Sequence, residues 1–371
     1  MVVYIDTSSQ HSPLSMFAVS MVSNLSYDGY STALVARRES PAYKHEFSGD
    51  VDKITSSFGW WAKVMLPVRI MKLCREEKRV RIITPSPYAA FICCGLRSKM
   101  INEGCDFKVI LVYPSSRPEP VDQTYSLCLK EVDRVVVASE VQRDEMTRFY
   151  QRIPRDKFTV LTPALTNLFP GKDKENNLPP KISAITLLYH GAITADCGLG
   201  PLIEALGRYH NLNVSLIVAG QGEGRYAMPL VRSVRNLGLG DRVTFLGDVP
   251  LTDDIISMTD IGVIPSAYNW TNPLTAVAFM SKGLPVIAAD SRLNRDIISD
   301  RVDGLFVNTT PGSDVSESWA ATLRMLIDNP DYITSMSGEA LRRAESEMTM
   351  EGFINKFKNF SDSHESKNRR S

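Results

Sequence analysis

Glycine-rich turns in the second half of the chain could bind a phosphate. Gly191 and Gly198 lie on either side of a turn that follows an apolar run and precedes a helical pattern. Glycine lets the backbone approach a ligand closely, and the helix that follows offers unpaired amide groups to an anion. Gly220 and Gly222 form a similar turn after the next apolar run. That turn is weaker evidence of a ligand site, because a tight turn alone needs the same residues.

The segment from Asn272 to Ala276 predicts the start of a helix. Asn is a favourable N-cap residue, and Pro273 suits the first helical position. The amide groups of Thr275, Ala276 and Val277 would then lack partners, at the end of the helix where the dipole is positive. This geometry suits a diphosphate, although an ordinary capped helix would show the same sequence pattern.

A third turn and a lone histidine complete the candidate site. Gly247, Asp248 and Val249 follow a further apolar run, and their backbone could contact a nucleobase edge. His11 lies in the loop after the first apolar run, where it could orient an acceptor or a phosphate. A single histidine is equally consistent with a structural role.

These residues need a scaffold of parallel strands. Short β-rich runs alternate with helical stretches, which predicts parallel sheets covered by helices on both faces. Ligands bind such sheets at the carboxyl ends of the strands. The length favours two domains, and the polar stretch 170–181 is typical of a linker. We therefore expect an N-terminal domain over 1–171, a C-terminal domain over 172–360 whose last helices could return to the first, and a disordered tail over 361–371.

The predicted strands and helices follow from these runs. The strands of the first series are 2–5, 31–35, 80–83, 107–113, 134–138 and 158–162. Those of the second are 185–190, 214–219, 242–246, 261–264 and 285–288. The helices predicted with them are 14–27, 199–209, 227–237 and 274–282.

Composition narrows the class of protein. Lys+Arg and Asp+Glu are both 42, which argues against a nucleic-acid binder that works through a global basic field. The first residues have no basic region, so we expect no signal peptide, and no apolar stretch is long enough to span a membrane. The six cysteines lack zinc or disulfide spacing, and we expect free thiols in a cytoplasmic protein.

The order and spacing of motifs resemble the retaining glycosyltransferases of family 4, which have the GT-B fold. The matching segments are 189–191, 198–199, 202–205, 217–222, 237–247, 259–266, 279–288 and 303–307, with weaker matches at 133–139, 157–161 and Phe169. The resemblance implies two Rossmann-like, doubly wound domains that face each other across a cleft. It also implies a nucleotide-sugar donor in the second domain, a glycan or lipid-linked acceptor in the first, and transfer with retention. No cofactor or metal is expected, because the nucleotide sugar is a substrate. The donor contacts it implies are Gly191, Ala192, Gly198, Gly220, Gly222, Gly247, Asp248, Val249, Pro273, Leu274, Thr275 and Ala276.

Several family positions carry unusual residues. Cys197 and Ala192 stand where relatives have basic side chains, and Trp270 and Ala278 stand where relatives have two glutamates. Other basic residues could compensate, although each would ordinarily be a surface residue: Arg225, Lys282, Arg292 and Arg295. These departures leave open a degenerate GT-B protein that binds a nucleotide, a glycan or a partner without transfer. An epimerase or phosphorylase is less favoured, and a dehydrogenase is disfavoured because no Gly-x-Gly-x-x-Gly turn follows the first strand.

One stretch of the first domain could contact a membrane. Tandem tryptophans are followed by repeated basic residues, a composition typical of interfacial helices. The residues concerned are Trp60, Trp61, Lys63, Arg69 and Lys72. A core helix with a solvated basic edge is the alternative, and Pro67 would kink a continuous amphipathic helix. Peripheral attachment at the inner face of the membrane is the corresponding prediction.

Overall fold

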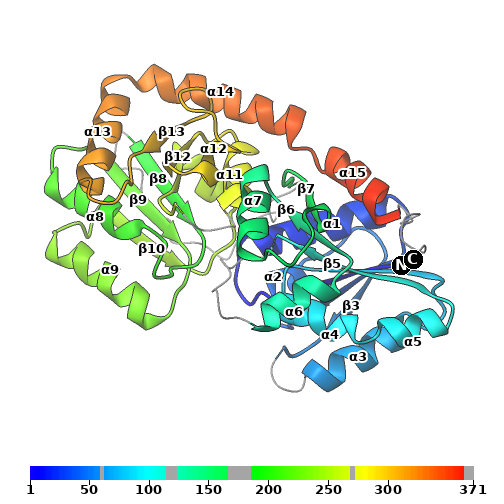
Figure 1. Cartoon of the computed structure of the whole chain (residues 1–371). Helices are drawn as coiled ribbons and strands as arrows, with labels where there is room; N and C mark the ends of the chain where they lie inside the picture. Colours follow the sequence, from blue (N-terminus) through cyan, green and yellow to red (C-terminus); the bar gives the residue numbers. More distant parts are fainter. Residues whose placement is uncertain (59–61, 114–122, 166–184, 268–271, 363–371) are drawn as a thin grey trace.

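The chain folds into two lobes, each built on a parallel sheet (Figure 1). The computed structural model describes residues 1–58, 62–113, 123–165, 185–267 and 272–362. The first lobe has a seven-stranded sheet in the order β3-β2-β1-β4-β5-β6-β7. The second has a six-stranded sheet in the order β10-β9-β8-β11-β12-β13. Both sheets are doubly wound, which confirms the predicted GT-B architecture.

The elements of the first lobe are mostly those predicted from apolar runs. Its strands are β1 (Val2–Asp6), β2 (Thr32–Ala36), β3 (Val51–Thr55), β4 (Arg79–Thr84), β5 (Asp106–Val112), β6 (Arg134–Val137) and β7 (Phe158–Val160). Its helices are α1 (Pro13–Tyr27), α2 (Pro41–Lys44), α3 (Ala62–Leu73), α4 (Pro87–Cys94), α5 (Arg97–Asn102), α6 (Gln123–Glu131) and α7 (Glu140–Phe149), with a 3-10 turn at Arg155–Lys157.

The second lobe repeats the alternation. Its strands are β8 (Ile185–His190), β9 (Val214–Ala219), β10 (Val243–Gly247), β11 (Ile261–Ile264), β12 (Val286–Ala289) and β13 (Gly304–Val307). Its helices are α8 (Leu199–Arg208), α9 (Gly224–Asn236), α10 (Asp253–Ser257), α11 (Asn272–Met280), α12 (Arg292–Arg295), α13 (Val315–Asp328) and α14 (Pro330–Glu347). A last helix, α15 (Met350–Asp362), follows α14.

Helices α1 and α11 join the lobes. They pack against each other, and one cluster of buried apolar side chains runs from α1 into α11. Phe17 of α1 and Phe279 of α11 are both fully buried in this cluster. The amino-terminal ends of two helices from different lobes are thereby held at the same junction.

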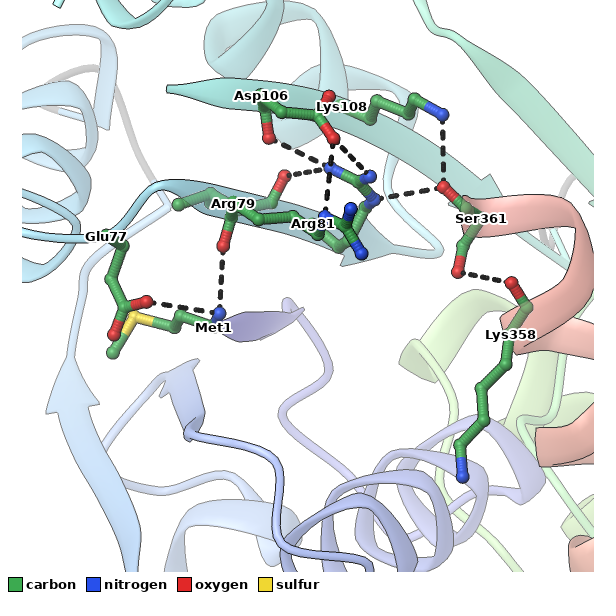
Figure 2. A network of polar contacts seen from close by, with 9 residues as sticks. Met1, Glu77, Arg79, Arg81, Asp106, Lys108, Lys358 and Ser361 are labelled. Carbon is green, nitrogen blue, oxygen red and sulfur yellow. Dashed lines mark hydrogen bonds and ion pairs between the residues drawn. The ribbon is translucent and has the colours of Figure 1, made fainter. Parts of the chain in front are cut away.

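Helix α15 lies on the first lobe, far from the second sheet that precedes it in the chain (Figure 1). Phe353 makes an edge contact with Phe17 of α1, with ring centroids 5.4 Å apart. At the end of α15, the Ser361 carbonyl accepts hydrogen bonds from Arg81 Nε (3.1 Å) and Lys108 Nζ (3.0 Å), as Figure 2 shows. Cations at a helix C-terminus are favourable because the dipole is negative there.

The predicted C-terminal tail and the predicted domain boundary lie partly or wholly outside the described residues. The predicted tail begins at residue 361, but α15 continues through Asp362 because its last turn is fixed by Arg81 and Lys108. Residues 361 and 362 thus belong to α15, and residues 363–371 lie outside the described residues. The predicted domain boundary near residue 172 also lies outside them. Among the described helices, none is long and apolar enough to cross a membrane.

Candidate functional site

A cavity of about 300 Å³ lies at the junction of the two lobes. Its wall is built from the start of α1, the end of β8, the end of β11 and the first turn of α11. The second sheet reverses its winding between β8 and β11, and such a switch point is where doubly wound sheets bind ligands. The lining residues are Ser12, Pro13, Leu14, Tyr189, His190, Gly191, Ala192, Thr194, Val263, Ile264, Pro265, Ser266, Asn272 and Thr275.

Two helices begin at this cavity. Ser12 caps α1: its hydroxyl accepts from the Ser15 amide, and the Ser15 hydroxyl accepts from the Ser12 amide. Pro13 occupies the first turn, where its missing N–H costs nothing. The positive dipole ends of α1 and α11 therefore meet at one cavity. No Asp, Glu, Lys or Arg is found among the described residues that line it.

The start of α11 differs from the prediction in one detail. Asn272 lies within the first turn of the helix and not before it. Its side-chain amide donates to the Ser266 carbonyl (2.7 Å) and to Asn294 Oδ1 (2.9 Å), so it fixes the loop after β11 and is not an N-cap. Thr275 is 8% exposed and lines the cavity. Pro273, Leu274 and Ala276 are buried and do not line it.

The glycines of the second lobe have different roles from one another. Gly191 lines the cavity, but its amide already donates to the Ala219 carbonyl (3.1 Å). A Cβ atom at Gly220 would lie 1.8 Å from the Gly191 carbonyl oxygen, and one at Gly222 would lie 2.1 Å from that of Ile193. Gly220 and Gly222 therefore permit close packing of the loop after β8 on the loop after β9, and neither lines the cavity.

Gly198 also has a packing reason. Its φ of +75° is in the left-handed region, and a Cβ there would lie 2.4 Å from the Pro265 carbonyl oxygen. Gly198 thus brings the start of α8 against the loop that follows β11. Ala192 lines the cavity, and its carbonyl accepts from the Tyr189 hydroxyl (2.7 Å).

The turn after β10 connects the lobes. Gly247 has a φ of +76°, which glycine adopts without strain. The Asp248 carboxylate accepts from the His11 amide (2.7 Å) and lies 3.5 Å from His11 Nδ1. Burial lowers the pKa of His11, whereas Asp248 acts to raise it and Lys44 to lower it. His11, Asp248 and Val249 therefore meet beside the 300 Å³ cavity, and none of them lines it.

His190 is a residue of the wall that the sequence analysis did not single out. It ends β8, is 2% exposed, and neither ring nitrogen has a hydrogen-bond partner among the described residues. Burial, and then the nearby His11, lower its pKa to about 4, while a contact with the Val249 backbone outside ordinary hydrogen-bond geometry raises it. A polar residue at the end of an otherwise apolar strand was the available signal.

The basic residues considered as substitutes lie away from the cavity wall. Lys282 pairs with Asp253 (2.8 Å), and Arg295 pairs with Asp290 (2.6 Å). Arg225 pairs with Glu223 (2.6 Å), and Arg292 is exposed. At the family positions themselves, Cys197 and Ala278 are buried, and Trp270 lies outside the described residues. Burial raises the pKa of Cys197, so it is a neutral thiol.

Comparison with known proteins agrees with this geometry. Residues 184–329 match the family model described as "Glycosyl transferases group 1". This segment is a group 1 glycosyltransferase domain. The cavity wall at β8, β11 and α11 belongs to this group 1 domain, and α1 closes it from the other lobe.

Relatives by sequence carry a related description. The D-inositol 3-phosphate glycosyltransferase of Rhodococcus jostii is 27% identical over 246 residues, which is 62% of this chain and 53% of that protein. The Thermobispora bispora protein of the same description is 28% identical over 57% of this chain and 52% of that protein. The chain therefore spans about half the length of these curated relatives.

Solved structures share the whole fold. Anabaena Alr3699/HepE in complex with UDP and glucose superposes with a TM-score of 0.76, at 16% identity, covering 98% of this chain and 99% of that one. WaaG, a glycosyltransferase involved in lipopolysaccharide biosynthesis, superposes with a TM-score of 0.67 at 16% identity, covering 98% and 100%. At these identities the likeness establishes the fold alone.

Proposed function

We propose that this protein transfers a sugar, with retention, from a nucleotide-sugar donor to a glycan or lipid-linked acceptor. The observation that carries the proposal is the cavity at the β8–β11 switch point of the group 1 glycosyltransferase domain. The start of α11 in this domain and the start of α1 in the other lobe converge there. Its size suits part of a nucleotide sugar. The binding of UDP and of UDP-glucose by Anabaena HepE supports a uridine nucleotide as the first donor to test.

Catalysis would depend on the leaving diphosphate. Negative charge develops on it as the sugar departs, and preorganised dipoles aimed at that position lower the barrier. The helix starts at α1 and α11 would supply these dipoles, and the Thr275 hydroxyl would donate to a phosphate oxygen. The backbone of Gly247 to Val249 would hold the base, and His11 in the first lobe would orient the acceptor or a phosphate. No cofactor is part of this proposal.

A panel of nucleotide sugars tests the proposal through donor hydrolysis and binding. We expect Thr275→Val to weaken donor binding by about tenfold, because one hydrogen bond to a charged phosphate contributes about 1.5 kcal/mol or more. Thr322→Val is the matched control, since Thr322 lies on α13 and its hydroxyl donates to the Ser318 carbonyl. Absence of turnover and of saturable binding across the whole panel would reject the function.

A second candidate is nucleotide binding without transfer. The described cavity wall carries no charged side chain. The uncharged residues Cys197 and Ala278 occupy positions where relatives in the family carry charged side chains. Tight binding of a nucleoside diphosphate without turnover of any sugar nucleotide would favour it. Copurification with an active glycosyltransferase would point the same way.

We also propose a peripheral contact with the inner face of the membrane through α3. Ala62, Leu66 and Ile70 form the buried stripe of this helix, and the opposite face exposes apolar and basic side chains together. The exposed apolar residues are Val64, Met65 and Val68, and the basic ones on this helix are Lys63, Arg69 and Lys72. Trp60 and Trp61 lie outside the described residues.

Vesicle sedimentation tests the membrane contact. We expect the protein to bind anionic vesicles more than neutral ones, since each Lys or Arg near an anionic surface contributes about 1 kcal/mol. The double variant Val64→Ser/Val68→Ser should lose this binding. Met228→Ser on α9 of the second lobe, another exposed apolar residue, should retain it. Equal binding of anionic vesicles by both variants would exclude α3 as the membrane contact.

A further inference from the structure

His190 is a buried imidazole without a hydrogen bond of ordinary geometry among the described residues, because its contact with the Val249 backbone falls outside that geometry. Its side chain is 2% exposed, and neither ring nitrogen has a hydrogen bond within the described residues. It contributes to the wall of the 300 Å³ cavity. A buried polar group without a partner destabilises a fold, so its presence requires a reason. A ligand that enters the cavity would supply the missing partner.

The cavity has donors but little positive charge. Its described wall offers the hydroxyls of Ser12 and Thr275, whereas the Thr194 hydroxyl already donates to Asp196 Oδ1 (2.6 Å). The helix dipoles contribute only partial charge. No Lys or Arg is present in that described wall. Within it, His190 is the side chain that can become a cation by taking up a proton.

We propose that His190 binds the diphosphate of the donor directly and takes up a proton from solvent as the diphosphate enters. The identification of the anion as a donor diphosphate rests on the proposed function. No covalent bond forms or breaks: one ring nitrogen gains a proton and the resulting imidazolium donates to a phosphate oxygen. Binding of the diphosphate would thus induce a positive charge on His190 that the ligand-free protein lacks.

The surroundings of His190 suit this exchange. In the free protein, burial and the nearby His11 lower its pKa to about 4, so the ring is neutral at pH 7. His11 reaches it from the loop before α1, and Asp248, from the turn after β10, lies 3.5 Å from His11 Nδ1. Lys44 lowers the pKa of His11, and Asp196 raises the pKa of Tyr189. The Val249 backbone raises the pKa of His190 itself. A diphosphate would add the strongest negative charge to this set.

NMR titration of the histidine ring nitrogens tests the inference with inorganic pyrophosphate as the probe. We expect the pKa of His190 to rise from about 4 by roughly 1–3 when pyrophosphate is bound, the range typical of an opposite charge in contact. A His190 pKa that does not change at saturating pyrophosphate, or an absence of pyrophosphate binding, would overturn the inference.

Two substitutions separate a binding role from a structural one. His190→Gln retains a hydrogen-bond donor but cannot carry charge. Its affinity for pyrophosphate at pH 5 should fall by about tenfold for each unit by which the wild-type pKa in the bound state lies above that pH. His210→Gln, at an exposed histidine of the same lobe, is the control and should bind as wild type does.

Stability without ligand gives an independent readout. His190→Leu removes the two unsatisfied nitrogens, so the ligand-free variant should unfold at the same or a higher denaturant concentration than wild type. A structural histidine would instead show a lower midpoint. A lower midpoint together with unchanged pyrophosphate affinity in His190→Gln would contradict the inference.

The inference and the proposed function fail separately. If pyrophosphate raises the His190 pKa but no nucleotide sugar binds or turns over, the anion site stands and the glycosyltransferase proposal fails. If nucleotide sugars turn over while neither pyrophosphate nor the His190→Gln change alters the outcome, the function stands and His190 is not the diphosphate ligand.

Discussion

The glycine run after β9 allows a direct test of how the site is built. Gly220, Gly222 and Gly224 alternate along one short segment, yet the structure gives them different surroundings. Replacing Gly220 with alanine adds one methyl group directly against the backbone of the loop after β8. Replacing Gly224 adds the same group where the nearest atom, Met228 Cγ, is 4.0 Å away.

The expected loss of stability follows from the distances. The new methyl group would lie 1.8 Å from the Gly191 carbonyl oxygen, whereas side-chain Cβ atoms essentially never approach closer than 3.0 Å. The two loops must separate by about 1.2 Å. Overpacking costs about 1–3 kcal/mol, and loss of the bond from the Gly191 amide to Ala219 costs about 1 kcal/mol more. Gly220→Ala should therefore destabilise the protein by about 2–4 kcal/mol.

Denaturant unfolding and donor binding measure the two consequences. Gly220→Ala should lower the unfolding midpoint and weaken nucleotide binding, because Gly191 in the cavity wall moves. Gly224→Ala should be neutral or slightly stabilising, since it begins α9 and alanine favours helices. If the two variants had the same stability and affinity, the close approach of these loops would be refuted.

Three further predictions concern the packing of α15 on the first lobe, the buried Asp6, and the contact between His11 and Asp248. Phe353→Ala should destabilise the protein by about 3–5 kcal/mol in denaturant unfolding, because the ring is buried against Phe17; a loss as small as that of the exposed Leu341→Ala would refute the α15 contact. Burial raises the pKa of Asp6, so the folded state holds this proton more strongly, and stability should fall as pH rises from 3.8 through the raised value. Asp6→Asn should remove this pH-dependent part of the free energy of unfolding. Identical profiles of stability against pH for wild type and variant would contradict the role of Asp6. Asp248→Asn should lower the pKa of His11 further, because it removes a charge that raises it, and an NMR titration showing an unchanged His11 pKa would exclude the contact.

The architecture could be predicted from the sequence because it depends on local patterns. Apolar runs located β1 and β8, and the Ser-Pro pair at residues 12 and 13 begins α1 close to its predicted start. Strand β3 was not predicted, since Val51–Thr55 is an edge strand with charged, partly exposed residues and lacks an apolar run.

The details of the site depend on contacts that no local pattern records. The sequence could not show that Gly220 faces the Gly191 backbone and not a ligand, because that depends on the distance between two loops. The contact between His11 and Asp248 joins residues 237 positions apart. His190 becomes notable only when burial and the absence of a partner in the described structure are both known.

A crystal structure with a bound nucleoside diphosphate, UDP first, would test the central claim most directly. The account predicts the diphosphate in the cavity between α1 and α11, in hydrogen-bonding contact with Thr275 and the first turn of α11, with His190 at its edge. A diphosphate bound instead to surface cations such as Arg225 or Arg295, with this cavity still empty, would contradict it.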